Sequence, residues 1–343
     1  MNRTFSLLTS LMLGWSFFLG NAHAAEQQSF KDVPPSSGVF QAVEFLRAAG
    51  VLSGYSDGTF RPEAKVDRAA SLKVIVASHV KPEDLTPLTT STYTDIPAGT
   101  WYLPYAEAAR QLGIIDGPPK ATAFHGERPV TKVEFLKMFF VSEKVDVAGS
   151  FAEIKLPLSI DVQDPSTWYY PHLRYAITAS MTSVTKEGKF SPEKQLTRGD
   201  VALLLFRYVM YRQGRRTQAL LSEAETEILN ILQSLDKKDI TQAELASARA
   251  TLAARGALAA KPDDPLVKGA IKVTEGFAAL VQAYRAGSEN RLQDAINLAG
   301  SAWSFAAKAK EFSPSLSSIT TQMQTIAKSI ADQARALQKQ SQK

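Results

Sequence analysis

The sequence predicts a mainly α-helical protein, in which a pseudo-threefold domain of three repeats is followed by an antiparallel helical bundle. The first observation is a short element that opens an apolar helix and recurs at nearly constant spacing between residues 67 and 200. The second is a change of composition at Gly214, after which Ala, Gln, Ser, Leu and Lys dominate and apolar residues recur three and four positions apart. Recurrence at a fixed period is typical of stacked repeats, and the three-and-four pattern is typical of packed helices.

Residues 1–24 have the pattern of a signal peptide. Arg3 precedes an apolar stretch from Phe5 to Leu19, and Ala22-His23-Ala24 is the small-x-small pattern that a signal peptidase cleaves. The apolar stretch is shorter than the roughly 20 residues that span a bilayer. We therefore expect cleavage after Ala24, no transmembrane segment in the mature chain, and export to the cell surface, cell wall or periplasm-facing envelope. A retained N-terminal anchor is the alternative.

Composition excludes several classes of site. The chain has 343 residues, a formal net charge of +5 and no cysteine. The lack of cysteine excludes disulfides, a thiolate zinc site, a cysteine nucleophile and a lipoprotein anchor. Charges of both signs are interspersed without a long basic run, so we expect no nucleic-acid partner and only a weak preference for anionic ones. We also expect no metal and no cofactor.

The recurring element appears as Asp67–Ala70, Thr131–Glu134 and Thr197–Asp200, so its copies begin 64 and 66 residues apart. Upstream of each copy lie a lead-in that contains an aspartate, an aromatic that introduces a first helix, and a turn-rich loop that ends in an aromatic. One such unit cannot bury its apolar faces alone, so three units should pack together. We expect repeats over residues 28–82, 92–145 and 158–212, and a helical C-terminal domain over residues 213–343.

The motifs occur in a fixed order: the lead-in Phe30-Lys31-Asp32-Val33, a tryptophan as at Trp101, the loop Gly54-Tyr55-Ser56-Asp57-Gly58-Thr59-Phe60-Arg61-Pro62, and Thr197-Arg198. Over a little more than half of the chain, this order resembles the S-layer homology domain. The resemblance implies a non-catalytic wall anchor that binds secondary cell-wall polymers, typically with pyruvylated sugars, in grooves between repeats.

Each copy departs from the family pattern in its own way. Lys132 stands where the family has arginine, Phe40 stands where a tryptophan is usual, and the third copy has lost the loop glycine that follows the first helix. Lysine lacks the planar fork with which arginine grips a carboxylate. We therefore expect one or two working grooves and not three.

The second residue of each recurring element is a cation: Arg68, Lys132 and Arg198. A cation in the first turn of a helix is disfavoured by the helix dipole. Exposed amides at a helix N-terminus attract anions, and a guanidinium added there can bind a carboxylate through two hydrogen bonds. Two interpretations remain open from the residues alone. Each cation binds an anionic partner, or each pairs with a lead-in aspartate.

The resemblance implies a set of polysaccharide-binding residues. Arg68 and Arg198, and more weakly Lys132, would bind the ligand carboxylate; Asp32, Asp95 and Asp161 would bind sugar hydroxyls; Trp101 and Trp168 would stack on sugar; and Gly54, Gly58 and Gly117 would let backbone approach closely. From the residues alone, core packing is an equally good interpretation of each ring. Asp57-Gly58 is most simply a turn, and Thr131 with Glu134 fits a capping box.

The C-terminal third reads as a bundle of about five helices. We expect them over Arg215–Leu235 and then from Thr241, Asp264, Ser288 and Ser313 onwards. The acidic residues Glu223, Glu225 and Glu227 read as a solvated helix face. Because no flexible linker precedes Arg215, the two domains should be rigidly coupled. The bundle would display a partner, bind other surface proteins or support self-assembly.

Catalytic motifs are missing from the sequence. It contains no Gly-x-Ser-x-Gly, no His-Glu-x-x-His, no phosphate-binding loop and no dinucleotide fingerprint. After signal removal its histidines are His79, His125 and His172, one in each repeat. We therefore predict a surface-anchoring protein that is not an enzyme. The alternative is a wall-active glycan hydrolase carried on the repeats, which would need a pair of carboxylates in a cleft.

Overall fold

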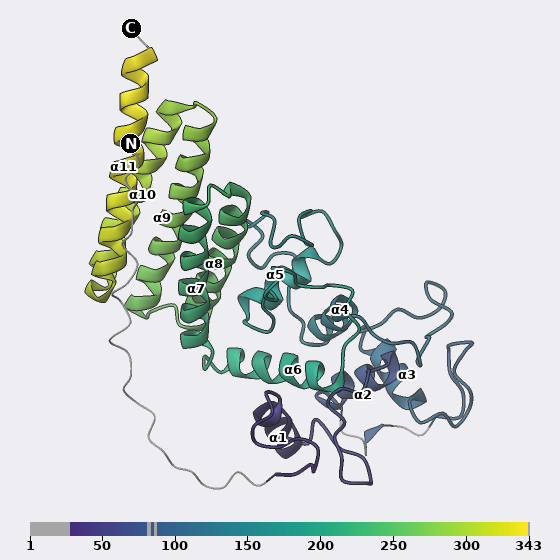
Figure 1. The fold of residues 1–343 in the computed structure, drawn as a ribbon. Helices are drawn as coiled ribbons and strands as arrows, with labels where there is room; N and C mark the ends of the chain where they lie inside the picture. The colour runs from purple at the N-terminus through teal and green to yellow at the C-terminus, as the bar shows by residue number, and fades with distance from the viewer. Residues whose placement is uncertain (1–27, 81–83, 86–87, 342–343) are drawn as a thin grey trace.

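A computed structural model describes residues 28–80, 84–85 and 88–341 (Figure 1). Over these residues the chain forms eleven α-helices and no strand longer than an isolated bridge, which confirms the predicted mainly α fold. The predicted signal peptide and its cleavage site lie outside the described residues. Among the described helices, none combines the length and hydropathy that crossing a membrane requires.

Each repeat contributes two helices, as predicted. The repeats form α1 (Phe40–Ala48) and α2 (Arg68–Ala77), α3 (Leu103–Gln111) and α4 (Lys132–Ser142), and α5 (Tyr170–Thr178) and α6 (Arg198–Arg212). The second helix of each repeat packs against the first helix of the next: α2 on α3, α4 on α5, and α6 back on α1. We call these contacts interface 1–2, interface 2–3 and interface 3–1. The third interface closes the repeats into a ring.

A triangle of backbone hydrogen bonds lies at the centre of this ring. The amide of Val66 donates to the carbonyl of Leu196 at 3.0 Å, Leu196 donates to Val130 at 3.0 Å, and Val130 donates to Val66 at 3.1 Å. All three residues are buried, and each belongs to a different repeat. Since buried amides and carbonyls need partners, the three repeats satisfy one another at this point.

The second helices begin with the caps that the sequence predicts. The Asp67 side chain accepts the amide of Ala70 without a reciprocal partner. Thr131 with Glu134 and Thr197 with Asp200 form complete capping boxes. Each cap residue directly precedes the motif cation, which is therefore the first residue of its helix.

The C-terminal region is a bundle of five helices in which neighbours in sequence pack together (Figure 1). They are α7 (Thr217–Asp236), α8 (Ile240–Ala260), α9 (Pro265–Ser288), α10 (Leu292–Phe312) and α11 (Ser317–Ser341), with a short 3-10 helix, Pro314–Leu316, before the last.

Two predicted helix starts are wrong and one is confirmed. The second bundle helix begins at Ile240, because Asp239 accepts the amide of Gln242 and caps it two residues before Thr241. The fourth begins at Leu292 and not near Ser288, where α9 still continues. Asp264 caps α9 as expected, with proline in the first turn.

The repeats and the bundle share one apolar core. Leu220, Leu252 and Val267 of the bundle belong to the same buried cluster as the core of the repeats. Helix α8 lies so close to α5 that a Cβ atom on Gly256 would be 1.8 Å from the carbonyl oxygen of Thr178. The predicted rigid coupling therefore follows from direct packing of helix on helix.

A buried ion pair reinforces this junction. Arg249 Nε lies 2.7 Å from Glu227 Oε1, and Nη2 lies 2.8 Å from Oε2. Arg249 also donates from Nη1 to the carbonyl of Leu158, in the third repeat, at 3.1 Å. Glu223 accepts the hydroxyl of Ser180 at 2.6 Å. The prediction of a solvated acidic face is thus wrong for Glu223 and Glu227, because both face the repeats.

We predict that Arg249→Met lowers the free energy of unfolding by about 3–5 kcal/mol, because Glu227 would be left buried without its partner. Arg335→Met is the matched control: Arg335 pairs with Asp332 at 3.0 Å on the exposed surface, and loss of such a pair costs about 1 kcal/mol or less. Urea unfolding followed by circular dichroism measures both. Equal effects of the two substitutions would contradict the structural role given to the buried pair.

Candidate ligand-binding surfaces

The three lead-in aspartates clamp the loops of their own repeats. Asp32 accepts the amides of Phe60 and Arg61, both at 2.7 Å. The same pair of bonds joins Asp95 to Phe124 and His125, and joins Asp161 to Phe190 and Ser191. Both oxygens of each carboxylate are therefore engaged within the protein, and a role in binding sugar hydroxyls stays a prediction.

This clamp explains a backbone feature that the sequence does not reveal. The residue after each loop aromatic, namely Arg61, His125 and Ser191, has a positive φ of 58°, 58° and 51°. Residues other than glycine rarely adopt this conformation. The aspartate holds the amide of each one in place. The only trace in the sequence is the constant distance from aspartate to aromatic, 28 to 29 residues.

The three cations reach across to the loop of the next repeat. Arg198 donates to the carbonyls of Phe60 at 2.7 Å and Ser53 at 2.8 Å, and Lys132 donates to the carbonyl of Phe190. Arg68 lies 5.4 Å from the ring centre of Phe124, and among the described residues its guanidinium has one hydrogen-bonding contact, to the sulfur of Met138 at 3.6 Å.

Neither interpretation of the cations drawn from the sequence describes these contacts. The first two amides of each second helix donate to carbonyls of the next repeat, as Arg68 and Ala69 donate to Arg128 and Gly126 at 2.9 Å. The helix N-termini are therefore not open anion sites. Within the described part of the chain, none of the three cations forms an ion pair with a lead-in aspartate.

Electrostatics still favours an anion near these cations. Burial lowers the pKa of Arg68, and repulsion from Arg128 adds to this effect. Burial also lowers the pKa of Lys132 and Arg198. Carboxylates of the protein offset part of this effect: Glu134 acts on Arg68, Asp200 and Asp161 act on Lys132, and Asp32 acts on Arg198. A partly desolvated cation gains from an anionic ligand, and the guanidinium of Arg68 donates to sulfur whereas the other two cations donate to carbonyl oxygens.

Trp101 and Trp168 lie on the surface. They are 54% and 52% exposed, so core packing is the wrong interpretation of these two rings. Each begins an aromatic group at the start of a first helix: Trp101 contacts Tyr102 and Tyr105 edge-on, and Trp168 contacts Tyr169 and His172 in the same way.

A lysine from the preceding repeat lies over each tryptophan. The Nζ atoms of Lys73 and Lys137 are both 5.7 Å from the ring centre, of Trp101 and Trp168 respectively. Sequence reasoning missed these lysines, although each follows the motif cation by five residues. The third repeat has Leu203 at this position.

Interface 1–2 therefore carries a row of three aromatic rings with a cation at each end, which we call the cation–ring row. Arg68 lies over Phe124, which is 5.7 Å from Tyr102; Tyr102 is 5.4 Å from Trp101, over which Lys73 lies. Interface 2–3 keeps part of this row: Lys137 lies over Trp168, and Lys132 donates to the carbonyl of Phe190. There, burial and the charge of Lys137 lower the pKa of His172, so this ring is neutral near pH 7.

Interface 3–1 is different. Counted from the helix starts at Phe40, Leu103 and Tyr170, the position of the two tryptophans is taken by Gly38. The predicted equivalence of Phe40 with the tryptophans is wrong, because Phe40 is a buried first helical residue. Arg198 instead lies over Tyr55, which also stacks against Arg61 at 3.9 Å. This interface has lost both the lysine and the tryptophan.

Contacts and turns within the protein explain why glycine stands at the three positions predicted to approach a ligand. A Cβ atom on Gly54 would lie 2.2 Å from the ring of Phe30, and Gly58 has a φ of +80°. Its amide closes a turn on the carbonyl of Tyr55 at 3.0 Å, which confirms the turn interpretation. On Gly117, a Cβ atom would lie 2.4 Å from the side chain of Arg110. Close approach of a ligand to these glycines stays a prediction.

Comparison with known proteins decides the family of the repeats. The model of the S-layer homology domain matches residues 29–70, 92–136 and 163–202. The chain carries three S-layer homology domains. Each match runs through the loop into the first turn of the second helix and contains the motif cation; the first two also contain the lead-in aspartate, whereas the third begins two residues after Asp161.

The chain is also similar to curated surface proteins. The chain is similar to "Surface-layer 125 kDa protein" of Lysinibacillus sphaericus, 23% identical over 229 residues, and to "S-layer protein" of Bacillus licheniformis, 24% identical over 185 residues. It also matches "Cell surface glycoprotein 1" of Acetivibrio thermocellus, 25% identical over 164 residues. The matches cover 66%, 52% and 46% of this chain but 18%, 20% and 7% of those proteins. The chain therefore spans a fifth or less of the length of these relatives.

The aspartate clamps predict acid sensitivity. Partial burial alone would raise the pKa of Asp95, but the amides of Phe124 and His125 outweigh it and lower this pKa; the pKa values of Asp32 and Asp161 are lowered in the same way. A pKa that folding lowers contributes stability above the unfolded value of about 3.9, and this contribution is lost as the pH falls below it. The unfolding free energy should therefore decrease from about pH 5 towards pH 3.

Asp95→Asn should lower the free energy of unfolding at pH 7 by about 1–3 kcal/mol, because a charged acceptor of two amides is lost. It should also reduce the slope of stability between pH 5 and pH 3. Asp263→Asn, at a fully exposed side chain, is the control and should leave both quantities unchanged. Thermal unfolding across this pH range measures the effect, and an unchanged slope in Asp95→Asn would refute the clamp.

Proposed function

We propose that this protein is a non-catalytic anchor of the cell surface whose S-layer homology domains bind an anionic cell-wall polysaccharide. The observation that carries the proposal is the cation–ring row at interface 1–2, where Lys73 lies over the exposed Trp101 and Arg68 lies over Phe124 at the other end of the row. The printed names of the relatives, a surface-layer protein and S-layer proteins, support a location at the cell surface. Cleavage after Ala24 would release the mature chain to that side.

In the proposed mode of binding, Trp101 supplies an apolar face for a sugar ring. Its edge contacts with Tyr102 and Tyr105 hold the ring while half of its surface remains exposed. The guanidinium of Arg68 would bind a carboxylate of the polymer, such as that of a pyruvyl group, through two hydrogen bonds. Lys73, which lies over the ring of Trp101, would add a second positive charge.

The three interfaces would contribute unequally. Interface 2–3 keeps the tryptophan and the lysine but has Lys132 in place of the arginine, and the ammonium of Lys132 already donates to a carbonyl. Interface 3–1 keeps Arg198, whose guanidinium is held by two carbonyls, and has no tryptophan. We therefore propose interface 1–2 as the principal site and interface 2–3 as a weaker one, with Arg198 contributing mainly by closing the ring.

The helical bundle would serve display or assembly. It is fixed to the third repeat by α8 on α5 and by the Glu227–Arg249 pair, so its orientation follows that of the anchored repeats. Binding to other surface proteins or to further copies of this chain belongs to the same proposal.

Retention on wall polysaccharide tests the proposal. The chain from residue 25 onwards should be retained on pyruvylated polymer, and Arg68→Gln or Trp101→Ala should weaken retention about tenfold or more, since a bidentate carboxylate contact or a stacked ring is lost. Trp303→Ala is the matched control, because Trp303 lies on the bundle and is 46% exposed. Arg335→Gln is the control for the arginine.

Two results would overturn this proposal. Equal retention on polymer from which pyruvate has been removed would exclude carboxylate recognition. An effect of Trp303→Ala as large as that of Trp101→Ala would exclude the tryptophan at interface 1–2 as a specific contact. Release of reducing ends from the polymer, assayed in the same tubes, would instead favour the glycan hydrolase.

A further inference from the structure

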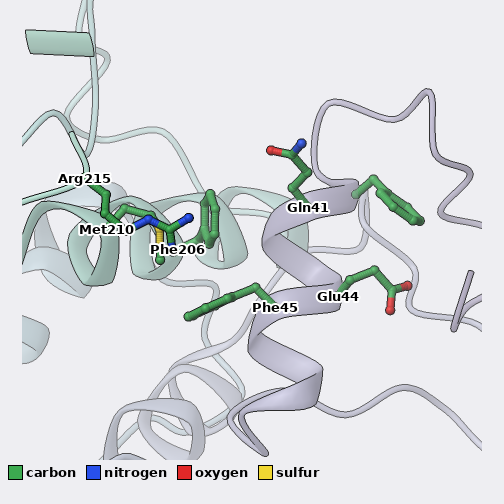
Figure 2. Close-up of a pocket in the computed structure, with 7 residues that line it drawn as sticks. Gln41, Glu44, Phe45, Phe206, Met210 and Arg215 are labelled. Atoms are coloured by element: carbon green, nitrogen blue, oxygen red, sulfur yellow. The ribbon is translucent and has the colours of Figure 1, made fainter. Parts of the chain in front are cut away.

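A pocket of about 430 Å³ opens at interface 3–1, away from the motif cations (Figure 2). It lies between the outer face of α1 and the second half of α6, where α6 approaches the bundle. Its apolar part is formed by Phe45, Phe206 and Met210, and its polar rim by Gln41, Glu44 and Arg215. Nothing in the proposed polysaccharide mode uses these residues.

Comparison of the three interfaces explains why this pocket is open. Counted from the helix starts, Phe45 corresponds to Ala108 and Tyr175, and Phe206 corresponds to Val76 and Phe140. The ring pair Phe45–Phe206, at 5.4 Å, thus has a counterpart in the pair Tyr175–Phe140, at 5.0 Å, and both pairs meet edge to face.

The two ring pairs differ in what covers them. At interface 2–3, Phe140 and Tyr175 are buried, and Phe151 packs on Tyr175 at 6.2 Å. Phe151 comes from the segment that joins the second and third repeats. At interface 1–2 the corresponding positions hold Val76 and Ala108, so neither of them carries a ring. At interface 3–1 the chain continues from α6 into α7, and both rings stay half-buried.

The polar rim of the pocket favours a negatively charged ligand. Arg215 is exposed and forms no ion pair among the residues that the structure describes. The Glu44 side chain points away from Arg215 (Figure 2), and its carboxylate accepts the amide of Ser29 at 2.9 Å and the hydroxyl of Ser29 at 2.5 Å. The carboxylate of Glu44 is therefore already hydrogen-bonded within the protein, and the guanidinium of Arg215 is available to a ligand.

We propose that this pocket binds a small aromatic carboxylate. The aromatic ring would take the place that Phe151 has at interface 2–3 and pack on Phe45 and Phe206 with the offset or edge geometry that aromatic rings prefer. Its carboxylate would bind the guanidinium of Arg215. This inference is independent of polysaccharide binding, because the pocket shares no residue with the cation–ring row at interface 1–2.

Isothermal titration of the chain from residue 25 onwards with indole-3-propionate tests the proposal. We expect saturable binding, and binding at least about tenfold weaker for the neutral indole-3-propionamide, since the charged contact is lost. Arg215→Gln should reduce the difference between acid and amide to less than threefold. Gln41→Trp should abolish binding of both compounds, because the introduced tryptophan side chain would itself occupy the pocket.

Arg47→Gln is the matched control: Arg47 is an exposed arginine of α1 that does not line the pocket, and binding should be unchanged. Gln41 and Arg215 are both exposed, so their substitution leaves the core intact, and equal thermal unfolding midpoints verify this. The proposal is overturned if the wild type shows no saturable binding, if the amide binds as tightly as the acid, or if Gln41→Trp binds like the wild type.

Discussion

Three backbone hydrogen bonds, from Val66 to Leu196, from Leu196 to Val130 and from Val130 to Val66, constrain everything around them. Their residues are separated by 64 to 130 positions in the chain, so the bonds form only when all three repeats are present and correctly placed. Once formed, they fix the start of each second helix, because the cap residue and the motif cation follow directly. The cation then falls on the loop of the next repeat, and the loop is held by an aspartate clamp. The binding surfaces are thus a consequence of how the ring closes.

Much of this arrangement was predictable because it repeats. Three copies of one element give the helix pairs, the caps and the mainly α fold without knowledge of any contact. The sequence also pointed to Trp101 and Arg68, since each stands at a fixed place in its motif. The sequence could not show which repeat each side chain faces. Arg198 is a motif residue of the third repeat, yet its partners Phe60 and Ser53 lie in the first. The contact of Arg198 with the first repeat depends on closure of the ring of three repeats, and no pattern in the sequence near Arg198 indicates it.

The errors have physical reasons of the same kind. Glu223 and Glu227 read as a solvated face because alternate acidic residues on a helix usually are solvated, but the third repeat covers that face and supplies Ser180 and Leu158 as neighbours. Phe40 was matched to a tryptophan by its aromatic character, whereas the helix start shows it to be a core residue and places Gly38 at the surface position. Lys73 and Lys137 were overlooked because an isolated lysine has no signature until the ring beneath it is known.

The junction between α6 and the bundle has a mechanical consequence. Force applied to the C-terminal helices is transmitted to the repeats through two parallel routes. One is the short peptide connection from α6 to α7, and the second is the lateral contact of α8 with α5. The Arg249 side chain belongs to the second route, since it joins Glu227 of α7 to the carbonyl of Leu158. Load applied along the bundle is therefore shared between two elements of the third repeat. Because that repeat is also bonded to the first through Arg198, the load is spread around the closed ring before any single helix end has to bear it alone.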